Sequence, residues 1–149
     1  MGRPVSRIYL DACAIIYLVE AGNPFHEATV RQILRYQAAP GGAMLTSRLA
    51  RMECRVRPLR EKNTTLLDKY EEFFARKRLV VLEITADIIE RATSVRVQYD
   101  LKTPDALHLA TAMEHRAETF VTGDPAFVRC REIAVDILKL PIPGTLPVP

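Results

Sequence analysis

Four acidic residues of this chain each fall at the carboxyl end of an expected strand or in the first turns of the helix that follows it. They are Asp11, Glu53, Asp105 and Asp124. In an open parallel sheet, ligands bind at this edge, most often where the strand order reverses. If the first strand is central and the fourth lies beside it across that point, Asp11 and Asp124 come close together.

Four carboxylates at one edge would repel each other. Two unit charges about 4 Å apart cost about 4 kcal/mol at an effective dielectric near ~20, so we expect a cation among them. Ligand sets made only of oxygen select hard ions such as Mg²⁺ or Mn²⁺. An ion held by carboxylates activates water and steadies the charge on a phosphoryl group. The four acids therefore predict hydrolysis of a phosphodiester or phosphate ester.

Three of the acids also have a purely structural interpretation. Asp11 stands between a strand and a helix, where an aspartate often caps the helix. Asp124, in "TGDPAF", suits a turn or the start of a helix. For Asp105, Thr103 can be the N-cap and Pro104 the first helical residue, and an acid in the first turn favours the helix dipole.

Glu53 is harder to explain by structure alone. It sits at the edge of an apolar helical stripe, and unpaired buried charge is costly. A salt bridge to an arginine at the edge of the core is the structural alternative. The stripe consists of Leu49, Met52 and Val56.

Short apolar strands alternate with helices, which predicts an α/β fold with a central parallel sheet of four to five strands, covered on both faces. The expected strands are Val5–Leu10, Ala43–Thr46, Leu79–Ile84, Thr119–Thr122 and Ala134–Leu138. The expected helices are Cys13–Glu20, Phe25–Ala38, one capped by Ser47 and ended or kinked by Pro58, Asn63–Lys77, one from Thr85 to about Tyr99, and Pro104–Ala117. We expect one domain over residues 1–140 and a proline-rich tail over 141–149.

The bulk composition narrows the class of protein. A hydrophobic fraction of 48% in 149 residues supports a core, and the net charge of +3 permits a nucleic-acid partner without arguing for one. Cys13, Cys54 and Cys130 fit reduced, mostly buried thiols better than a disulfide frame or a zinc site. No apolar run is long enough to span a membrane, and no signal peptide is visible, so we expect a cytoplasmic protein.

Four pieces of sequence resemble PIN-domain ribonucleases, and among them the VapC toxins of bacterial and archaeal toxin–antitoxin pairs. They are "IYLDACAIIYLVE", "TSRLARMEC", "KTPDALHLATA" and "FVTGDPAF", which occur in the family's order between residues 8 and 127. The resemblance implies a compact three-layer α/β/α fold and a Mg²⁺- or Mn²⁺-dependent endoribonuclease. It carries the main metal site onto Asp11, Glu53 and Asp105, with Asp124 binding directly or through water. It also implies a homodimer and a small VapB-type antitoxin that covers the active site.

Supporting residues follow from the same comparison. Thr122 matches the family's hydroxyl position and would orient a water or a carboxylate. His108, one helical turn after Asp105, is expected to support the site rather than bind magnesium. The arginines that flank Glu53 could position RNA phosphates, with a solvated helix face as the alternative. They are Arg48, Arg51 and Arg55.

The sequence also departs from the family's pattern. Ala12 and Cys13 stand where the family often has hydroxyl or amide residues, and Ala126 stands where it often has an acid. These changes keep a second hypothesis open, a module that binds RNA or protein but cleaves little. A phosphatase with Asp11 as nucleophile is a third hypothesis, but it would want a second aspartate at position 13.

Overall fold

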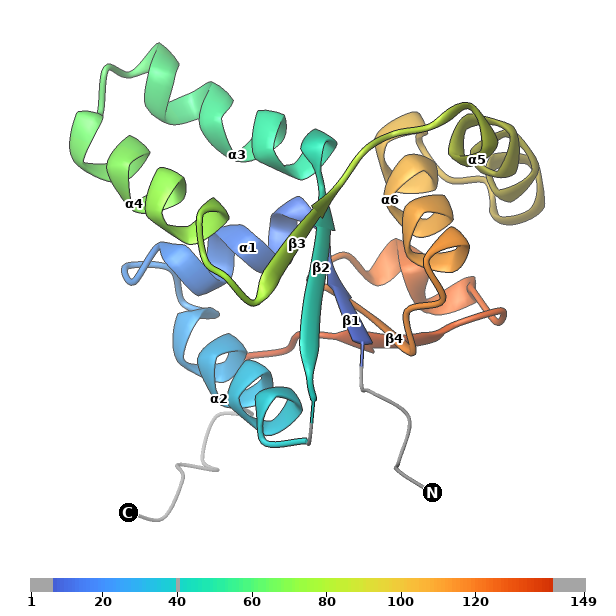
Figure 1. The fold of residues 1–149 in the computed structure, drawn as a ribbon, viewed down its shortest axis with the longest axis horizontal. Coiled ribbons are helices and arrows are strands. Elements are labelled where there is room, and N and C mark those ends of the chain that lie inside the picture. Colours follow the sequence, from blue (N-terminus) through green and yellow to red (C-terminus); the bar gives the residue numbers. More distant parts are fainter. Residues whose placement is uncertain (1–6, 40, 141–149) are drawn as a thin grey trace.

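One five-stranded parallel sheet forms the centre of the protein. The computed structural model describes residues 7–39 and 41–140 (Figure 1). The strands are β1 (Arg7–Leu10), β2 (Ala43–Ser47), β3 (Leu79–Leu82), β4 (Thr119–Thr122) and β5 (Ala134–Ile137), in the order β3-β2-β1-β4-β5. Every neighbouring pair is parallel. The expected parallel sheet is confirmed.

Helices cover both faces of the sheet, which gives three layers (Figure 1). One face carries α1 (Ala12–Val19), α2 (His26–Gln37), α3 (Arg48–Arg60) and α4 (Thr64–Phe74). The other carries α5 (Ala86–Tyr99), α6 (Thr103–Glu114) and the short 3₁₀ helix η1 (Pro125–Arg129). The predicted α/β/α architecture is confirmed. None of the described helices has the length and apolar character needed to cross a membrane.

The central strand β1 is buried on both sides. Its side chains alternate between the two faces, as the strand period of two requires. Ile8 and Leu10 join the core beneath α1 to α4, and Tyr9 joins the core beneath α5 and α6. Tyr9 stacks on Phe120 of β4, with ring centroids 5.5 Å apart. Because both faces are packed, β1 provides a rigid support for Asp11, the residue that follows it.

The strand order reverses at β1. The chain first runs outward from β1 to β2 and β3, and then returns to place β4 and β5 on the other side. In the register of the sheet, Leu10 of β1 lies beside Val121 of β4. The carboxyl ends of β1 and β4 are therefore adjacent, which confirms the arrangement assumed for Asp11 and Asp124.

Several expected boundaries were wrong. α3 does not end at Pro58 but continues to Arg60. The proline removes one backbone hydrogen bond, and the helix as a whole packs against α1 and α4. α6 begins at Thr103, with Lys102 as an N-cap that makes no side-chain bond. The other element ends shift by a few residues at most, as helix and strand ends commonly do. The predicted tail and the first two residues of the first expected strand lie outside the described residues.

The caps of two other helices were predicted correctly. Ser47 accepts a hydrogen bond from the backbone of Ala50 at the start of α3, and Thr85 accepts one from Ile88 at the start of α5. All three cysteines are free thiols. Cys54 and Cys130 are buried, while Cys13 is half-buried, so the expectation of reduced, mostly buried thiols is confirmed.

Candidate active site at the carboxyl edge of the sheet

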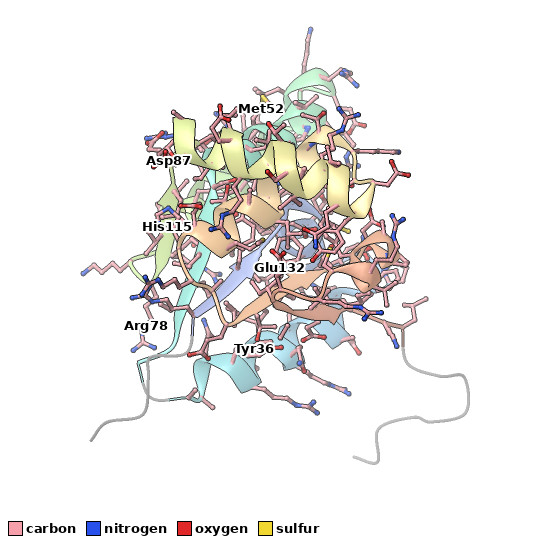
Figure 2. All side chains as sticks on the ribbon, turned by 90° about the vertical axis from the view of Figure 1, so that its right-hand side faces the viewer. Tyr36, Met52, Arg78, Asp87, His115 and Glu132 are labelled. Atoms are coloured by element: carbon pink, nitrogen blue, oxygen red, sulfur yellow. The ribbon has the colours of Figure 1, made fainter. Side chains whose placement is uncertain are left out.

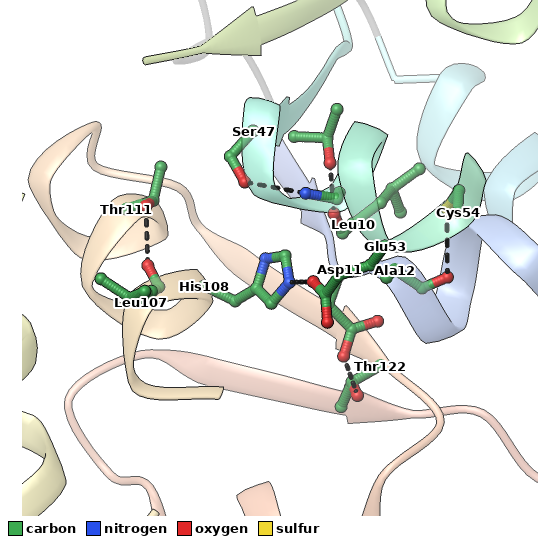
Figure 3. A network of polar contacts seen from close by, with 12 residues as sticks. Leu10, Asp11, Ala12, Ser47, Glu53, Cys54, Leu107, His108, Thr111 and Thr122 are labelled. Atoms are coloured by element: carbon green, nitrogen blue, oxygen red, sulfur yellow. Dashed lines mark hydrogen bonds and ion pairs between the residues drawn. The ribbon is translucent and has the colours of Figure 1, made fainter. Parts of the chain in front are cut away.

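Asp11 lies at the end of β1 and caps α1. Its Oδ1 accepts the N–H of Ala14 at 2.9 Å. Its Oδ2 accepts the hydroxyl hydrogen of Thr122 (Figure 3). The residue is only 4% exposed. Burial raises the pKa of Asp11 to about 6, against the opposing effects of His108, Thr122 and the Ala14 N–H, and the carboxylate of Asp105 raises it further. The capping interpretation is therefore confirmed, and the same carboxylate is also buried within electrostatic range of a second acid, Asp105.

The hydroxyl of Thr122 connects Asp11 with Asp124. Thr122 is fully buried, and its Oγ1 accepts the backbone N–H of Asp124 at 3.0 Å while its hydrogen goes to Asp11. Asp124 in turn caps η1, because its Oδ1 accepts the N–H of Ala126 at 2.9 Å. Thr122 therefore holds the carboxylate of Asp11 and also the backbone of the turn that carries Asp124.

Glu53, on α3, pairs with His108 of α6 rather than with an arginine. Glu53 Oε1 lies 2.6 Å from His108 Nε2 (Figure 3). His108 Nδ1 lies 2.8 Å from the hydroxyl of Tyr9. Because the carboxylate has no hydrogen to give, Nε2 is the donor in this pair. His108 is 2% exposed and Tyr9 is fully buried. A relay of three side chains thus joins the buried centre of β1 to the carboxylate at the edge.

Asp105 lies in the first turn of α6 and is half-buried. Burial raises its pKa, and the carboxylates of Asp124 and Glu53 raise it further, whereas His108 and Lys102 lower it. These effects require acids from three different elements to lie within electrostatic range of each other. Together with the effect of Asp105 on Asp11, they place all four predicted acids in one neighbourhood.

The four acids suit a hard cation in their chemistry, though not in their present side-chain positions. In residues 7–39 and 41–140, no three His, Cys, Asp or Glu side chains are arranged to hold an ion. Three of the carboxylates instead accept hydrogen bonds from protein donors: Asp11 from Thr122, Asp124 from the Ala126 N–H and Glu53 from His108. A carboxylate oxygen that accepts one hydrogen bond retains a second lone pair. A cation would also relieve the repulsion that raises the pKa of Asp105.

The three arginines that flank Glu53 on α3 form ion pairs with acids. Arg48 pairs with Glu83 at 2.7 Å, and Arg51 and Arg55 pair with Glu71 at 2.9 and 3.6 Å. These pairs are partly or largely exposed, so each contributes little to stability. In these pairs, Glu83 and Glu71 neutralise the positive charges of the arginines to which an RNA phosphate would bind. The role of these arginines in RNA binding stays a prediction.

Sequence reasoning missed two tyrosines near the acids. Tyr9 gave no signal beyond the alternation of its strand. Tyr17 of α1 packs directly on the backbone after β4, because a Cβ added to Gly123 would lie 2.4 Å from the Tyr17 ring. Burial raises the pKa of Tyr17, and the charges of Asp11 and Asp124 add to that rise. The glycine in "TGD" was the one available sign that a side chain lies across this turn.

The fold and the site define a class: a parallel α/β/α domain with acidic residues gathered at the carboxyl edge, where its strand order reverses. The sequence matches the PIN domain family over residues 8–133. That match covers most of the chain, and the protein belongs to the PIN domain family. A comparison with curated proteins gave no match.

Solved structures with a similar fold include several toxin–antitoxin proteins. A chain of VapBC2 from Rickettsia felis, bound to a promoter DNA fragment, has a TM-score of 0.73 at 14% identity, over 89% of this chain and 99% of that one. A toxin–antitoxin complex from Klebsiella pneumoniae gives 0.65 at 24%, over 85% and 95%. VapC20 of Mycobacterium tuberculosis, a sarcin–ricin loop cleaving toxin, gives 0.66 at 20%, over 81% and 92%. At these identities the likeness concerns the fold.

Proposed function

We propose that this protein is a metal-dependent endoribonuclease that hydrolyses RNA phosphodiester bonds and acts as the toxin of a toxin–antitoxin pair. The observation that carries the proposal is the gathering of Asp11, Glu53, Asp105 and Asp124 at the carboxyl edge of a PIN domain. These four side chains would hold Mg²⁺ or Mn²⁺. When bound, the ion would supply an activated water and balance the phosphoryl charge.

The residues of the chain have separate tasks in this mechanism. Thr122 and the Ala14 N–H orient the carboxylate of Asp11, and His108 orients that of Glu53. Asp105 is carried by the packed helix α6, which fixes its position better than a mobile loop would. Direct attack by water leaves a 3′-hydroxyl and a 5′-phosphate.

Purified full-length protein tests the proposal with an unstructured RNA and Mn²⁺ or Mg²⁺. We expect Asp11→Asn and Asp105→Asn to lower the cleavage rate by at least about 100-fold, since each removes a charged group that acts in the transition state. Asp68→Asn, an exposed change on α4, serves as the matched control. Equal activity in all four proteins would point to a contaminant, and a 2′,3′-cyclic phosphate end would contradict attack by water.

The toxin part of the proposal rests on the resemblance and on the solved relatives that are toxin–antitoxin proteins. It implies a VapB-type antitoxin, a homodimer and a place in the cytoplasm. Induced expression should arrest growth in wild type and not in Asp11→Asn. Co-expression of a short reading frame that lies just upstream should restore growth.

A second function remains open, a PIN module that binds RNA or protein while cleaving little. Ala12 and Ala126, at positions where the family often has polar residues, favour it. RNA binding without metal-dependent cleavage in the wild type would support this function over the first.

A further inference from the structure

A groove of about 260 Å³ lies between α2 and the end of β5. It is separate from the four acids, and no sequence motif pointed to it. Its polar and charged lining comes from two segments that are far apart in the chain. These residues are Arg31, Gln32 and Arg35 of α2 and Asp136 and Lys139 at the end of β5.

The groove carries positive charge. Arg31, Arg35 and Lys139 are exposed, and no carboxylate of residues 7–39 and 41–140 forms an ion pair with any of them. Asp136 is the acid in the lining, and its Oδ2 already accepts hydrogen bonds from Tyr36 at 2.6 Å and from Gln32 at 2.7 Å. Three cations therefore face the groove, and the carboxylate beside them is held by neutral donors.

The arginines that flank Glu53 on α3 differ from these cations in both pairing and place. Arg48, Arg51 and Arg55 are bound to Glu83 and Glu71, and their helix lies away from α2. Figure 1 shows α2 and α3 apart. Figure 2 shows the same separation, with Tyr36 of α2 low in the view and Met52 of α3 high. The three arginines that flank Glu53 are thus balanced by acids, whereas the three cations of the groove are not.

The groove also adjoins the acidic edge. The backbone N–H of Leu138, one residue before Lys139, donates to the carbonyl of Thr122 at 2.8 Å. Thr122 is the residue that contacts both Asp11 and Asp124. On the helix side, Tyr17 covers the turn after β4 and stacks on Phe25, which directly precedes α2, with ring centroids 4.5 Å apart.

We propose that this groove binds backbone phosphates of the RNA strand on one side of the bond to be cut. The proposal rests on the proposed ribonuclease function and assigns part of its substrate site. Arg31 and Arg35 are one helical turn apart on the same face of α2. Arginine forks bind phosphate oxygens in pairs, and a positive groove that follows the backbone is the common way to hold single-stranded RNA.

The test compares two triple variants that each remove three positive charges. The groove variant is Arg31→Gln, Arg35→Gln and Lys139→Gln. The control is Lys77→Gln, Arg78→Gln and Arg116→Gln, three exposed cations that lie outside the groove and outside α3. Binding of the full-length proteins to a labelled, unstructured RNA is measured by fluorescence anisotropy in EDTA over a range of salt concentrations. Each phosphate contact on a single strand adds about 0.7 to the slope of log affinity against log salt. We expect the groove variant to lose about 2 from that slope and to bind at least about tenfold more weakly at low salt.

A second measurement separates this proposal from the function on which it rests. With Mn²⁺, we expect the groove variant to hydrolyse bis(p-nitrophenyl) phosphate as the wild type does, while its kcat/KM for RNA falls. Equal loss of RNA binding in both triple variants, or loss in the control variant alone, would overturn the groove assignment and leave the nuclease proposal standing. A wild type that binds no RNA in any condition would overturn both, and the groove would then suit an acidic protein segment instead.

Discussion

Asp11 has two opposite effects on the stability of this protein. It caps α1 through the Ala14 N–H, which stabilises the fold, and it stands among acids in a buried place, which opposes folding once the carboxylate is charged. Replacing a capping aspartate with asparagine preserves an acceptor oxygen for the helix. The substitution therefore removes the charge and keeps most of the local structure.

We predict that Asp11→Asn changes the pH dependence of stability. The pKa of Asp11 is raised from 3.8 to about 6, so the folded protein retains a proton that the unfolded chain loses near pH 4. The free energy of unfolding of the wild type should then fall as the pH rises from about 4 to about 6, by about 3 kcal/mol for this group. Asparagine does not titrate, so the variant should gain stability over wild type across that window.

Urea unfolding in EDTA at several pH values measures this difference. Asp68→Asn, which changes an exposed aspartate on α4, should follow the wild type throughout. An offset between Asp11→Asn and wild type that stays constant from pH 4 to pH 7 would contradict the raised pKa.

The relay from Tyr9 to Glu53 joins three elements that are distant in sequence. Tyr9 belongs to β1, His108 to α6 and Glu53 to α3. Tyr9 and His108 are held by packing, since Tyr9 also stacks on Phe120 and meets the His108 ring edge-on. The relay therefore connects the packed central strand to the carboxylate of Glu53, whose side chain is one-third exposed, and restricts its position.

We predict that Tyr9→Phe weakens metal binding, although Tyr9 contacts His108 and is not itself one of the four acids. Loss of the hydroxyl frees the His108 ring, which then orients Glu53 less well. Partners that orient metal ligands are typically worth about 10–100-fold in affinity, and for a residue one step removed we expect about 3–10-fold. The dissociation constant for Mn²⁺ is measured by electron paramagnetic resonance, without any RNA present.

The matched control for this variant is Tyr70→Phe. Tyr70 is also fully buried and also donates its hydroxyl hydrogen toward an acid, Glu20, which is not one of the four site acids. It should lower stability by a similar amount and leave Mn²⁺ affinity unchanged. Equal affinities in Tyr9→Phe, Tyr70→Phe and wild type would show that the relay serves stability alone.

At the scale of the whole molecule, two separate cores meet at the sheet. One lies beneath α1 to α4 and the other beneath α5, α6 and η1. The site takes Asp11 and Glu53 from the first side and Asp105 from the second. Metal binding should therefore stabilise the domain as one unit, because a bound ion would join elements of both layers.

We predict that Mn²⁺ raises the unfolding temperature relative to EDTA. At a free concentration about 100 times the dissociation constant, binding to the folded state adds about 2.7 kcal/mol. In a domain of this size, each kcal/mol raises the unfolding temperature by about 2–4 °C. Calorimetry of wild type, Asp105→Asn and Asp68→Asn should show the shift in the first and third proteins only. A full shift in Asp105→Asn would remove that residue from the metal site.

The sequence by itself determined the class of fold and the identity of the candidate acids. Apolar strands that alternate with helices have few other ways to bury their faces, so the parallel three-layer sheet followed from the pattern. Asp11, Asp105 and Asp124 could be picked out because each stands next to a strand end or a helix start, and Glu53 because it lies at the edge of an apolar helical stripe. Helix caps at Ser47 and Thr85 followed in the same way, since capping depends on neighbours a few residues away.

Only the tertiary structure decided which side chains hold these acids in place. The pairing of Glu53 with His108, the support from Tyr9 and the ion pairs of the α3 arginines all join residues that are distant in sequence. The groove between α2 and β5 likewise exists because the end of β5 packs beside a helix from the first part of the chain. Local patterns report a residue's neighbours along the chain, whereas hydrogen bonds and charge pairs depend on distances that are set when the layers pack.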